Sequence, residues 1–218
     1  MNMAGRKFDA CAPSKPNKAV NRKGRKFDQV VEGARQVFMS DGFDGASVDD
    51  IAKAAGVSKA TLYAYFPDKK LLFLEVAKTE CKRQAEACFD VLQEGATLRD
   101  VLLSGAQHMI RFFISDFAQG VFRLCVAESE RFPEFGRDFY TSGPMMARNR
   151  LLEAFRAAND SGAMQIDDLQ LASDQFVELC KTDIWPRLIF GISREFSEEE
   201  IARVATGAVD VIFARYGV

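Results

Sequence analysis

The chain has 218 residues, 48% of them hydrophobic, so it can bury one large core or the cores of a small and a larger domain. It contains no run of about 18 apolar residues, so no membrane span is predicted, and residues 1–26 lack the apolar segment of a secretory signal peptide. Its 5 cysteines are scattered without a C-x-x-C pair, which favours a reducing cytoplasm over a disulfide-bonded secreted domain.

Positive charge is concentrated at the N-terminal end of the chain. The net charge is −2, yet residues 1–26 hold eight Lys or Arg and a single acidic residue, Asp9. The segment also contains Pro, Asn and Gly and few apolar residues, so we expect residues 1–25 to form a disordered basic arm. Such an arm is typical of a protein that binds an anionic polymer, but a merely solvated tail would have the same composition.

Helical periodicity begins at Phe27 and continues to Gly42, which is placed to end the first helix. Two short helices follow, with Ser47 and Ser58 as their predicted N-caps and Gly56 in the turn between them. A longer helix is predicted to begin at residue 69.

The rest of the chain also has helical spacing, and no convincing alternating strand occurs. Gly120 is expected to separate two helices, and Pro186 to kink another, because proline lacks the backbone donor and crowds the preceding turn. Thr97 and Ser197 are the predicted caps of two of these helices. The fold class is therefore all-α, with further helices predicted at 69–92, 98–117, 121–131, 144–159, 168–192 and 197–216.

The short helices on either side of Gly56 meet the steric requirements of a helix-turn-helix. The first helix needs a small residue where the second crosses it, the turn needs a residue that tolerates positive φ, and the second helix needs an apolar anchor. Ala52, Gly56 and Leu62 occupy these positions in order. An ordinary helical hairpin would satisfy the same spacing. In a DNA-binding protein the outward residues would enter a major groove, and here they are Lys59, Ala60, Thr61, Tyr63 and Ala64.

A longer stretch of sequence resembles the DNA-binding domain of the tetracycline-repressor (TetR) family of bacterial regulators. The resemblance covers residues 26–78 and is carried by SVDDIAKAAGVSKATLYAYFPDKKLLFLE at 47–75, by the preceding GARQVFMSDGFDGA, and above all by T-L-Y-x-Y-F-x-x-K at 61–69. It implies a three-helix DNA-binding domain at 26–78 and a larger helical domain at 79–218 for ligand binding and dimerisation.

The resemblance also implies roles for individual side chains on the DNA. Ser47 and Thr61 would contact phosphates, and Lys59 and Ala60 would approach base edges. The tyrosines would offer hydroxyls to phosphates, although Tyr65 has a packing role in the core as its alternative, and a lysine would neutralise a phosphate at the start of the fourth helix. The full set of predicted DNA contacts is Ser47, Ser58, Lys59, Ala60, Thr61, Tyr63, Tyr65 and Lys69.

The C-terminal half resembles the family less specifically, although FPEFGRDFYTSGP at 132–144 is similar to the regulatory domain of AefR-like repressors. The family implies a homodimer through the last two helices, here 168–192 and 197–216. Both helices have apolar faces that a dimer seam or the chain's own core would use equally well. The residues of these faces are Phe176, Leu179 and Cys180 on the first helix and Ile201, Val204, Ala208, Val211 and Ile212 on the second.

An effector cavity is expected in the same domain, because the chain has 19 Phe and 7 Met, many of them in its middle third. Aromatic and Met side chains mostly form core, but they also line adaptable apolar ligand sites. The predicted effector is small and apolar or amphipathic. The predicted lining residues are Phe89, Met109, Phe112, Phe113, Phe122, Phe139, Met146 and Trp185.

Two other classes of function are weighed against a repressor. An enzyme has little support, because His108 is the only histidine and no nucleotide-binding, zinc-protease or nucleophile-elbow motif occurs. No metal or cofactor is therefore predicted. A structural helical protein that only shares the fold is the second alternative. The sequence favours a cytoplasmic homodimer that binds a palindromic double-stranded DNA operator and is released by a small ligand.

Overall fold

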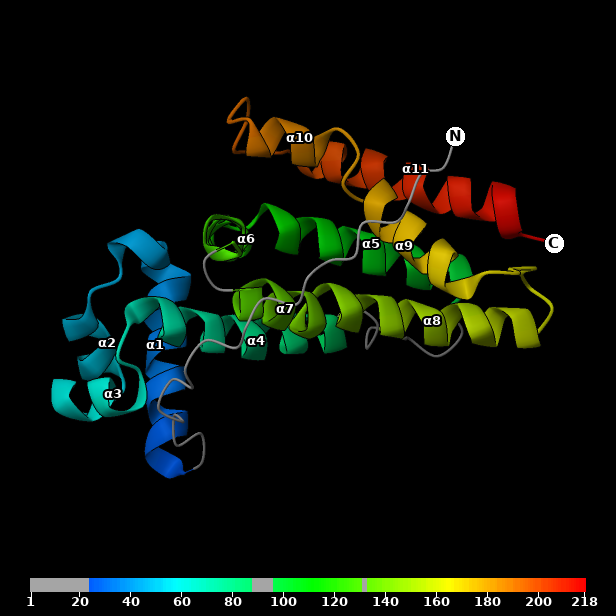
Figure 1. Ribbon diagram of the computed structural model, residues 1–218. Coiled ribbons are helices and arrows are strands. Elements are labelled where there is room, and N and C mark those ends of the chain that lie inside the picture. The colour runs from blue at the N-terminus through cyan, green and yellow to red at the C-terminus, as the bar shows by residue number, and fades with distance from the viewer. Residues whose placement is uncertain (1–23, 88–95, 131–132) are drawn as a thin grey trace, which may run out of the picture.

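The computed structural model describes residues 24–87, 96–130 and 133–218, and within these residues the chain is helical without a strand (Figure 1). The predicted all-α fold class is confirmed. The predicted basic arm lies outside the described residues except for Gly24 and Arg25, and Arg25 is already the first residue of a helix. In chain order the helices are α1 (Arg25–Gly45), α2 (Val48–Ala54), α3 (Lys59–Tyr65), α4 (Lys69–Ala87), α5 (Leu98–Ile114), α6 (Asp116–Glu128), α7 (Pro133–Ser142), α8 (Pro144–Asp160), α9 (Leu169–Leu179), α10 (Ile184–Ile189) and α11 (Glu198–Tyr216).

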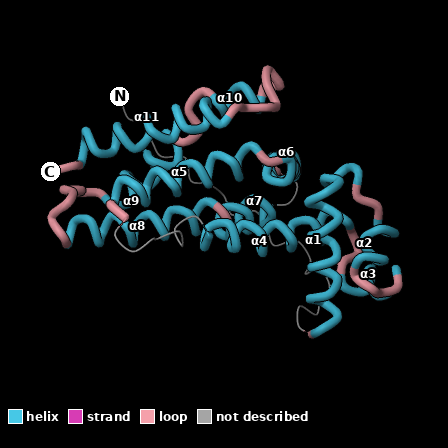
Figure 2. Tube along the Cα trace, turned by 180° about the vertical axis from the view of Figure 1, so that it is seen from behind, coloured by secondary structure: helices cyan, strands magenta, loops and turns pink. Residues whose placement is uncertain are grey.

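The three N-terminal helices form a small lobe at one end of the molecule, which we call the reading head (Figures 1 and 2). Here α1 packs against α2 and α4, and α2 packs against α3. Gly42 has φ 69° and ψ −178°, so it ends the regular part of α1 as predicted. The core of the reading head consists of apolar residues from every helix of the lobe and from the start of α4, among them Phe27, Val30, Ala34, Phe38, Ile51, Leu62, Phe66, Leu72 and Phe73.

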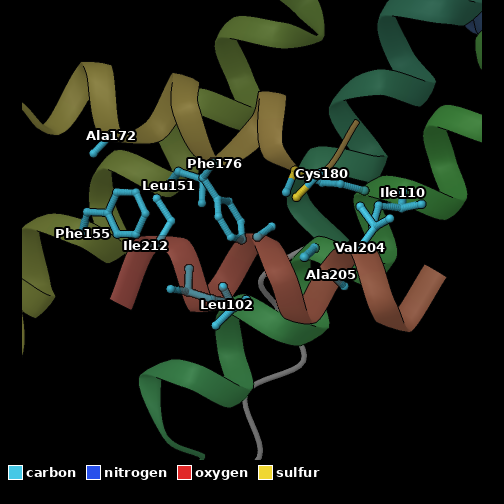
Figure 3. Close-up of a cluster of buried hydrophobic side chains, with 14 of the residues drawn as sticks. Leu102, Ile110, Leu151, Phe155, Ala172, Phe176, Cys180, Val204, Ala205 and Ile212 are labelled. Atoms are coloured by element: carbon cyan, nitrogen blue, oxygen red, sulfur yellow. The ribbon is translucent and has the colours of Figure 1, made fainter. Parts of the chain in front are cut away.

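The larger lobe is organised around α11, which packs along α5 and α9, while α9 in turn packs on α8 (Figure 3). Phe155 and Phe176 meet edge to face with ring centroids 6.3 Å apart, and both side chains are fully buried. Leu102, Leu151 and Ile212 surround them in the same cluster. Capping fixes the ends of α5 and α11: Thr97 with Asp100, and Ser197 with Glu200, form the reciprocal hydrogen bonds of a capping box, which confirms both predicted caps.

Two helices connect the lobes. Phe73 of α4 packs edge-on against Phe117 of α6 at 5.5 Å between ring centroids, and α6 also lies against α1. The core of the reading head therefore continues into the larger lobe through residues of α6. A displacement of α4 or α6 would shift α1 as well, because closely packed cores transmit strain.

The predicted break at Gly120 is wrong. The chain breaks five residues earlier, at Ser115, whose extended backbone and hydroxyl cap α6 by accepting a hydrogen bond from the Ala118 amide. Gly120 lies inside α6, where an added Cβ would come within 3.5 Å of the Phe73 ring. That distance is an ordinary contact, so the packing of α6 on α4 accepts a glycine here without requiring one.

The predicted single helix at 168–192, kinked at Pro186, is also wrong. The chain divides into α9 and α10, and the break falls at Asp183, whose φ is 65°. With ψ at −51° this is the geometry of a γ-turn, and the Ile184 amide donates to the Thr182 carbonyl at 2.7 Å across it. Pro186 is the third residue of α10, a position whose amide has no partner within the helix, so proline costs no hydrogen bond there.

A further difference concerns the segment 132–144, for which no helix is predicted from periodicity. Residues Pro133–Ser142 form α7, which packs on α4, α6 and α8. Gly143 separates α7 from α8, and Pro144 occupies the first turn of α8, where proline is favoured.

The apolar face that the sequence suggests for a dimer seam belongs mostly to the core of the single chain. Four predicted residues of α11 are buried in the core that α11 forms with α5 and α9, namely Ile201, Val204, Ala208 and Ile212. Phe176 and Cys180, in α9 and at its end, are buried in the same cluster. Val211, by contrast, points outward and is 50% exposed. A dimer through α11 would therefore have to use the opposite face of the helix.

No helix in the described part of the chain is long and apolar enough to cross a membrane. The described residues also contain no group of three or more His, Cys, Asp or Glu arranged to hold a metal ion.

Candidate DNA-binding surface and ligand cavity

The turn between α2 and α3 is closed by backbone hydrogen bonds around Gly56. Gly56 has φ 63°, its amide donates to the Lys53 carbonyl at 3.1 Å, and the Val57 amide donates to the Ala52 carbonyl at 3.0 Å. This pair of bonds is a Schellman motif, which requires a left-handed residue at the position of Gly56. The hydroxyl of Ser58 then accepts the Thr61 amide at 3.1 Å and begins α3.

A glycine of α1 sets how closely α2 approaches. A Cβ on Gly33 would lie 2.4 Å from the Ala55 nitrogen and 2.5 Å from its Cα. Real side chains do not come this close, so the turn between α2 and α3 rests directly on the backbone of α1. Sequence reasoning missed Gly33, although an isolated glycine in a strong helical pattern often has such a packing reason.

The outward face of α3 carries the residues predicted to read DNA. Leu62 is 1% exposed and anchors the helix in the core, whereas Lys59, Ala60 and Ala64 are exposed and Tyr63 is 49% exposed. Small residues beside one lysine and one tyrosine leave room for a base-pair edge against the helix. The geometry places the predicted residues together on a single protruding surface.

Lys59 is paired with an acidic residue of the preceding helix. Its ammonium forms a salt bridge with Asp49, and both side chains are more than half exposed. An exposed pair of this kind contributes little to stability, so a phosphate or a base can displace it at small cost. Asp49 holds Lys59 against the outer surface of α2 until a stronger acceptor is present.

The hydroxyls at the starts of α2 and α3 already have hydrogen-bond partners within the protein. Ser47 accepts the Asp50 amide at 3.1 Å, and the Thr61 hydroxyl lies 2.9 Å from that of Ser58. Each of these hydroxyls sits at the N-terminus of a helix, where amides and the helix dipole favour an anion. A phosphate contact at these positions would add to the cap rather than replace it.

Two predicted DNA contacts have structural partners. Tyr65 is half-buried and packs edge-on against Phe27 at 5.9 Å between ring centroids, in line with the packing alternative. Lys69 donates hydrogen bonds to the carbonyls of Phe43 and Ala46 at 2.8 and 3.0 Å, and its ammonium lies 4.6 Å from the Phe43 ring centroid. Lys69 thus fastens the end of α1 to the start of α4.

A cavity of about 210 Å³ lies in the larger lobe, and residues of α4, α5, α6, α7, α8, α9 and α10 line it. Its walls are largely apolar, and five of the 15 lining residues are aromatic. Trp185 meets Phe122 at 5.0 Å and Phe113 at 6.3 Å between ring centroids, both edge to face. Six of the predicted residues line it, namely Met109, Phe112, Phe113, Phe122, Phe139 and Trp185.

The other two predicted lining residues do not appear in this wall. Phe89 lies outside the described residues. Met146 is a correction: on α8 the cavity is lined by Pro144 and Ala147, and the helical rotation of about 100° per residue turns the intervening Met146 away from that face.

Sequence reasoning missed the polar groups of the cavity wall. Gln84 comes from α4 and Lys181 from the turn after α9, and neither lies in the Phe-rich middle segment. The Lys181 ammonium bonds the Glu178 carboxylate at 2.6 Å and lies 5.7 Å from the Phe113 ring centroid. No local signal marks either residue, because only the packing of distant helices brings them to one cavity.

Burial favours the neutral form of two titratable groups near the cavity, Cys81 and His108. Burial raises the pKa of the Cys81 thiol to about 12, with smaller contributions from Glu80 and Cys125. Burial also lowers the pKa of His108, assisted by the nearby Arg111. A neutral thiol and a neutral imidazole suit a site for an uncharged apolar ligand better than one for catalysis.

A protruding recognition helix on a small lobe, joined to a helical lobe that contains an apolar cavity, defines the class of helix-turn-helix DNA-binding regulators. The comparisons specify the family. Residues 30–76 match the model of "Bacterial regulatory proteins, tetR family", and residues 100–218 match "AefR-like transcriptional repressor, C-terminal domain". The chain belongs to the TetR family, as the sequence resemblance predicts, and this is a family of transcriptional regulators rather than enzymes.

Solved structures and curated proteins agree with this assignment. A protein described as a TetR-family transcriptional regulator from Mesorhizobium loti is 28% identical, with a TM-score of 0.74 over 89% of this chain and 98% of that one. The flavonoid-responsive regulator FrrA is 34% identical, with a TM-score of 0.66 over the same shares of the two chains. The biofilm operon negative regulator IcaR of Staphylococcus aureus is 26% identical over 52% of this chain and 59% of its own length, so the chain spans little more than half of that relative.

Proposed function

We propose that the chain is a transcriptional repressor that binds a palindromic operator as a homodimer and is released by a small, largely apolar aromatic ligand. The observation that carries the proposal is the joint presence of an exposed α3 face and an apolar cavity, lined in part by aromatic side chains, in one chain. The name of IcaR as a negative regulator supports repression, and the name of FrrA as flavonoid-responsive supports an aromatic ligand with phenolic hydroxyls.

The cavity favours a small ligand. Its volume of about 210 Å³ is below the range of roughly 300–1,000 Å³ that drug-sized ligands occupy, so a ligand of one or two fused rings fits it best. The aromatic side chains of the wall would pack edge to face against the rings of such a ligand. Such a ligand acts as an inducer only if it binds the DNA-releasing conformation more tightly than the DNA-bound one.

The α3 face is tested by mutation of its two largest exposed residues. Lys59→Ala and Tyr63→Ala should each weaken operator binding by about 1–3 kcal/mol, because each removes a direct contact with DNA. The measurement is a binding titration on DNA that the wild-type protein selects from genomic fragments. Lys82→Ala is the matched control, since Lys82 is an equally exposed cation on α4, 63% exposed, and lies outside the reading head. If both folded variants bind the operator as tightly as the wild type, Lys59 and Tyr63 make no important contact with DNA.

The homodimer is proposed to use the outer faces of α10 and α11, which lie together along one edge of the molecule in both views (Figures 1 and 2). Phe190 and Ile192, at the end of α10, are 78% and 73% exposed. On α11 the outward residues include Thr206, Gly207 and Val211, whose small side chains would let a second helix approach closely. A set of exposed apolar residues on neighbouring elements is typical of a surface that contacts another protein.

Val211→Asp should convert the dimer to a folded monomer with much weaker operator binding, because it places an unpaired charge in the proposed interface. Sedimentation velocity measures the change in mass. Val126→Asp is the matched control: Val126 is 58% exposed on α6, so the same substitution there should leave the dimer intact. If the Val211→Asp protein dimerises with the same dissociation constant as the wild type, the interface does not include this face of α11.

A further inference from the structure

A buried carboxylate on α4 lies between the cavity and the reading head. The Glu80 side chain is 3% exposed, and one of its oxygens accepts a hydrogen bond from Gln84 Nε2 at 2.6 Å. The other oxygen, Oε2, has no hydrogen-bond partner among the described residues. Its nearest cations are Arg83 Nη1 at 3.5 Å and Arg35 Nη1 at 3.9 Å.

Arg35 belongs to α1 and therefore to the reading head. Its guanidinium bonds the Glu32 carboxylate at 2.8 and 3.0 Å, and this hydrogen bonding is the main cause that raises the pKa of Arg35. Among the residues that the structure describes, Arg35–Glu80 is the only ion pair that joins α1 to α4. At 3.9 Å it is loose, since a charge-assisted hydrogen bond of this type is normally about 2.7–2.9 Å long.

Gln84 reaches both the carboxylate and the cavity. It lies one helical turn after Glu80 and lines the cavity wall. Because its Nε2 donates to Glu80, its Oε1 is the acceptor for His108 Nε2, 2.8 Å away. The amide keeps a second N–H and a second lone pair, so a ligand hydroxyl can bond it, and a ligand that draws the amide into the cavity lengthens its contact with Glu80.

We infer that the Gln84 amide binds a ligand hydroxyl and that its movement away from Glu80 strengthens the contact of Glu80 with Arg35. Occupancy of the cavity thereby alters the position of α1. This inference rests on the proposed function of the cavity as the effector site. When a ligand hydroxyl takes the Gln84 amide, Glu80 loses its 2.6 Å hydrogen bond while it stays buried. A buried carboxylate that loses a hydrogen bond is costly unless its remaining contacts tighten. Those contacts are Arg83, at 3.5 Å on its own helix, and Arg35, at 3.9 Å on α1, and closing the gap to Arg35 draws α1 toward α4. Glu80 and Gln84 are positioning residues in this scheme, and the ligand class is a hydroxyl-bearing aromatic compound.

The relay is tested without any ligand by a variant that imitates the displaced amide. Gln84→Leu removes the hydrogen bond to Glu80 and should lower operator affinity about tenfold, a typical size for coupling between two sites. Adding Glu80→Gln to Gln84→Leu should restore wild-type operator affinity, because no buried charge is left to pull on Arg35. The loss of the His108 partner is the same in both variants, so the comparison isolates the charge of Glu80. Gln170→Leu is the matched control: it makes the same substitution at an exposed position of α9 outside the cavity wall, so operator affinity should stay unchanged.

A thermodynamic cycle gives a second measurement that needs no DNA. The interaction energy between Arg35 and Glu80, obtained from the stabilities of Arg35→Gln, Glu80→Gln and their combination, should be larger in the Gln84→Leu background than in the wild type. Unchanged operator affinity in folded Gln84→Leu, failure of Glu80→Gln to restore it, or an unchanged interaction energy would each overturn the relay. A wild-type protein that captures no DNA would instead contradict the proposed function, while the cycle would still decide the relay.

Discussion

Gly33→Ala should abolish specific DNA binding, with a loss of at least about a hundredfold in operator affinity, or about 2.7 kcal/mol. The added Cβ would lie 2.4 Å from the Ala55 nitrogen and 2.7 Å from the Ala55 Cβ. The obstacle is backbone, which cannot rotate away as a flexible side chain can. The turn before α3 must therefore move off α1, and the recognition helix moves with it. Overpacking of this kind also costs about 1–3 kcal/mol of stability.

Gly136→Ala is the matched control for this substitution. Gly136 also lies inside a helix, but its added Cβ would come no closer than 3.4 Å to the Ser129 Cβ. Both substitutions gain about 1 kcal/mol of helix propensity, so only the contact with Ala55 distinguishes them. Thermal unfolding and operator titration are the measurements. A Gly33→Ala protein as stable as Gly136→Ala and equally active on DNA would show that α1 and α2 are not held together at this point.

Ala147→Trp should make a repressor that binds its operator normally and no longer responds to the ligand. Ala147 of α8 lines the cavity, and an indole ring would fill a large part of the 210 Å³ that a ligand needs. We expect ligand affinity to fall at least about a hundredfold, since a ligand can enter only by displacing a packed ring. The probes are phenolic aromatic compounds that raise the melting temperature of the wild-type protein, because a ligand of the native state stabilises it by mass action.

The control for the cavity variant is Ala163→Trp, at an exposed position in the turn after α8. It adds the same side chain to the surface and should retain the full thermal shift and the full release of DNA. Retention of both in Ala147→Trp would mean that the effector binds elsewhere. Stabilising compounds confined to sugars, metal ions or phosphorylated metabolites would contradict an apolar effector altogether.

The predictions made from local sequence hold where the physics is local. Ser47, Ser58, Thr97 and Ser197 cap helices as predicted, because a cap depends only on a side chain and the amides two or three residues later. Gly56 occupies the left-handed turn for the same reason. The helix-turn-helix and the family were identified from these signals together with the string at 61–69, and the family models match both halves of the chain.

Local sequence signals gave wrong helix boundaries where a segment contains more than one residue that could interrupt the helix. The sequence places a break at Gly120 and a kink at Pro186, yet the chain breaks at Ser115 and Asp183. A glycine inside a helix costs only about 1 kcal/mol relative to alanine, and a proline is tolerated in a first turn. Which of several possible breaks is used depends on what packs against the helix, and that information is not local.

By itself, then, the sequence determined the helical class, the recognition helix and the outward identity of Lys59 and Tyr63, since periodicity, caps and a turn glycine act within a few residues of the chain. Tertiary structure alone decided which face of α11 is buried, that Lys69 bonds the carbonyls of Phe43 and Ala46, and that Gln84 and Trp185 meet at one cavity. These outcomes depend on contacts between helices far apart in the chain. An apolar face fits a monomer core and a dimer seam equally well, and only the packed molecule shows which surface is already covered.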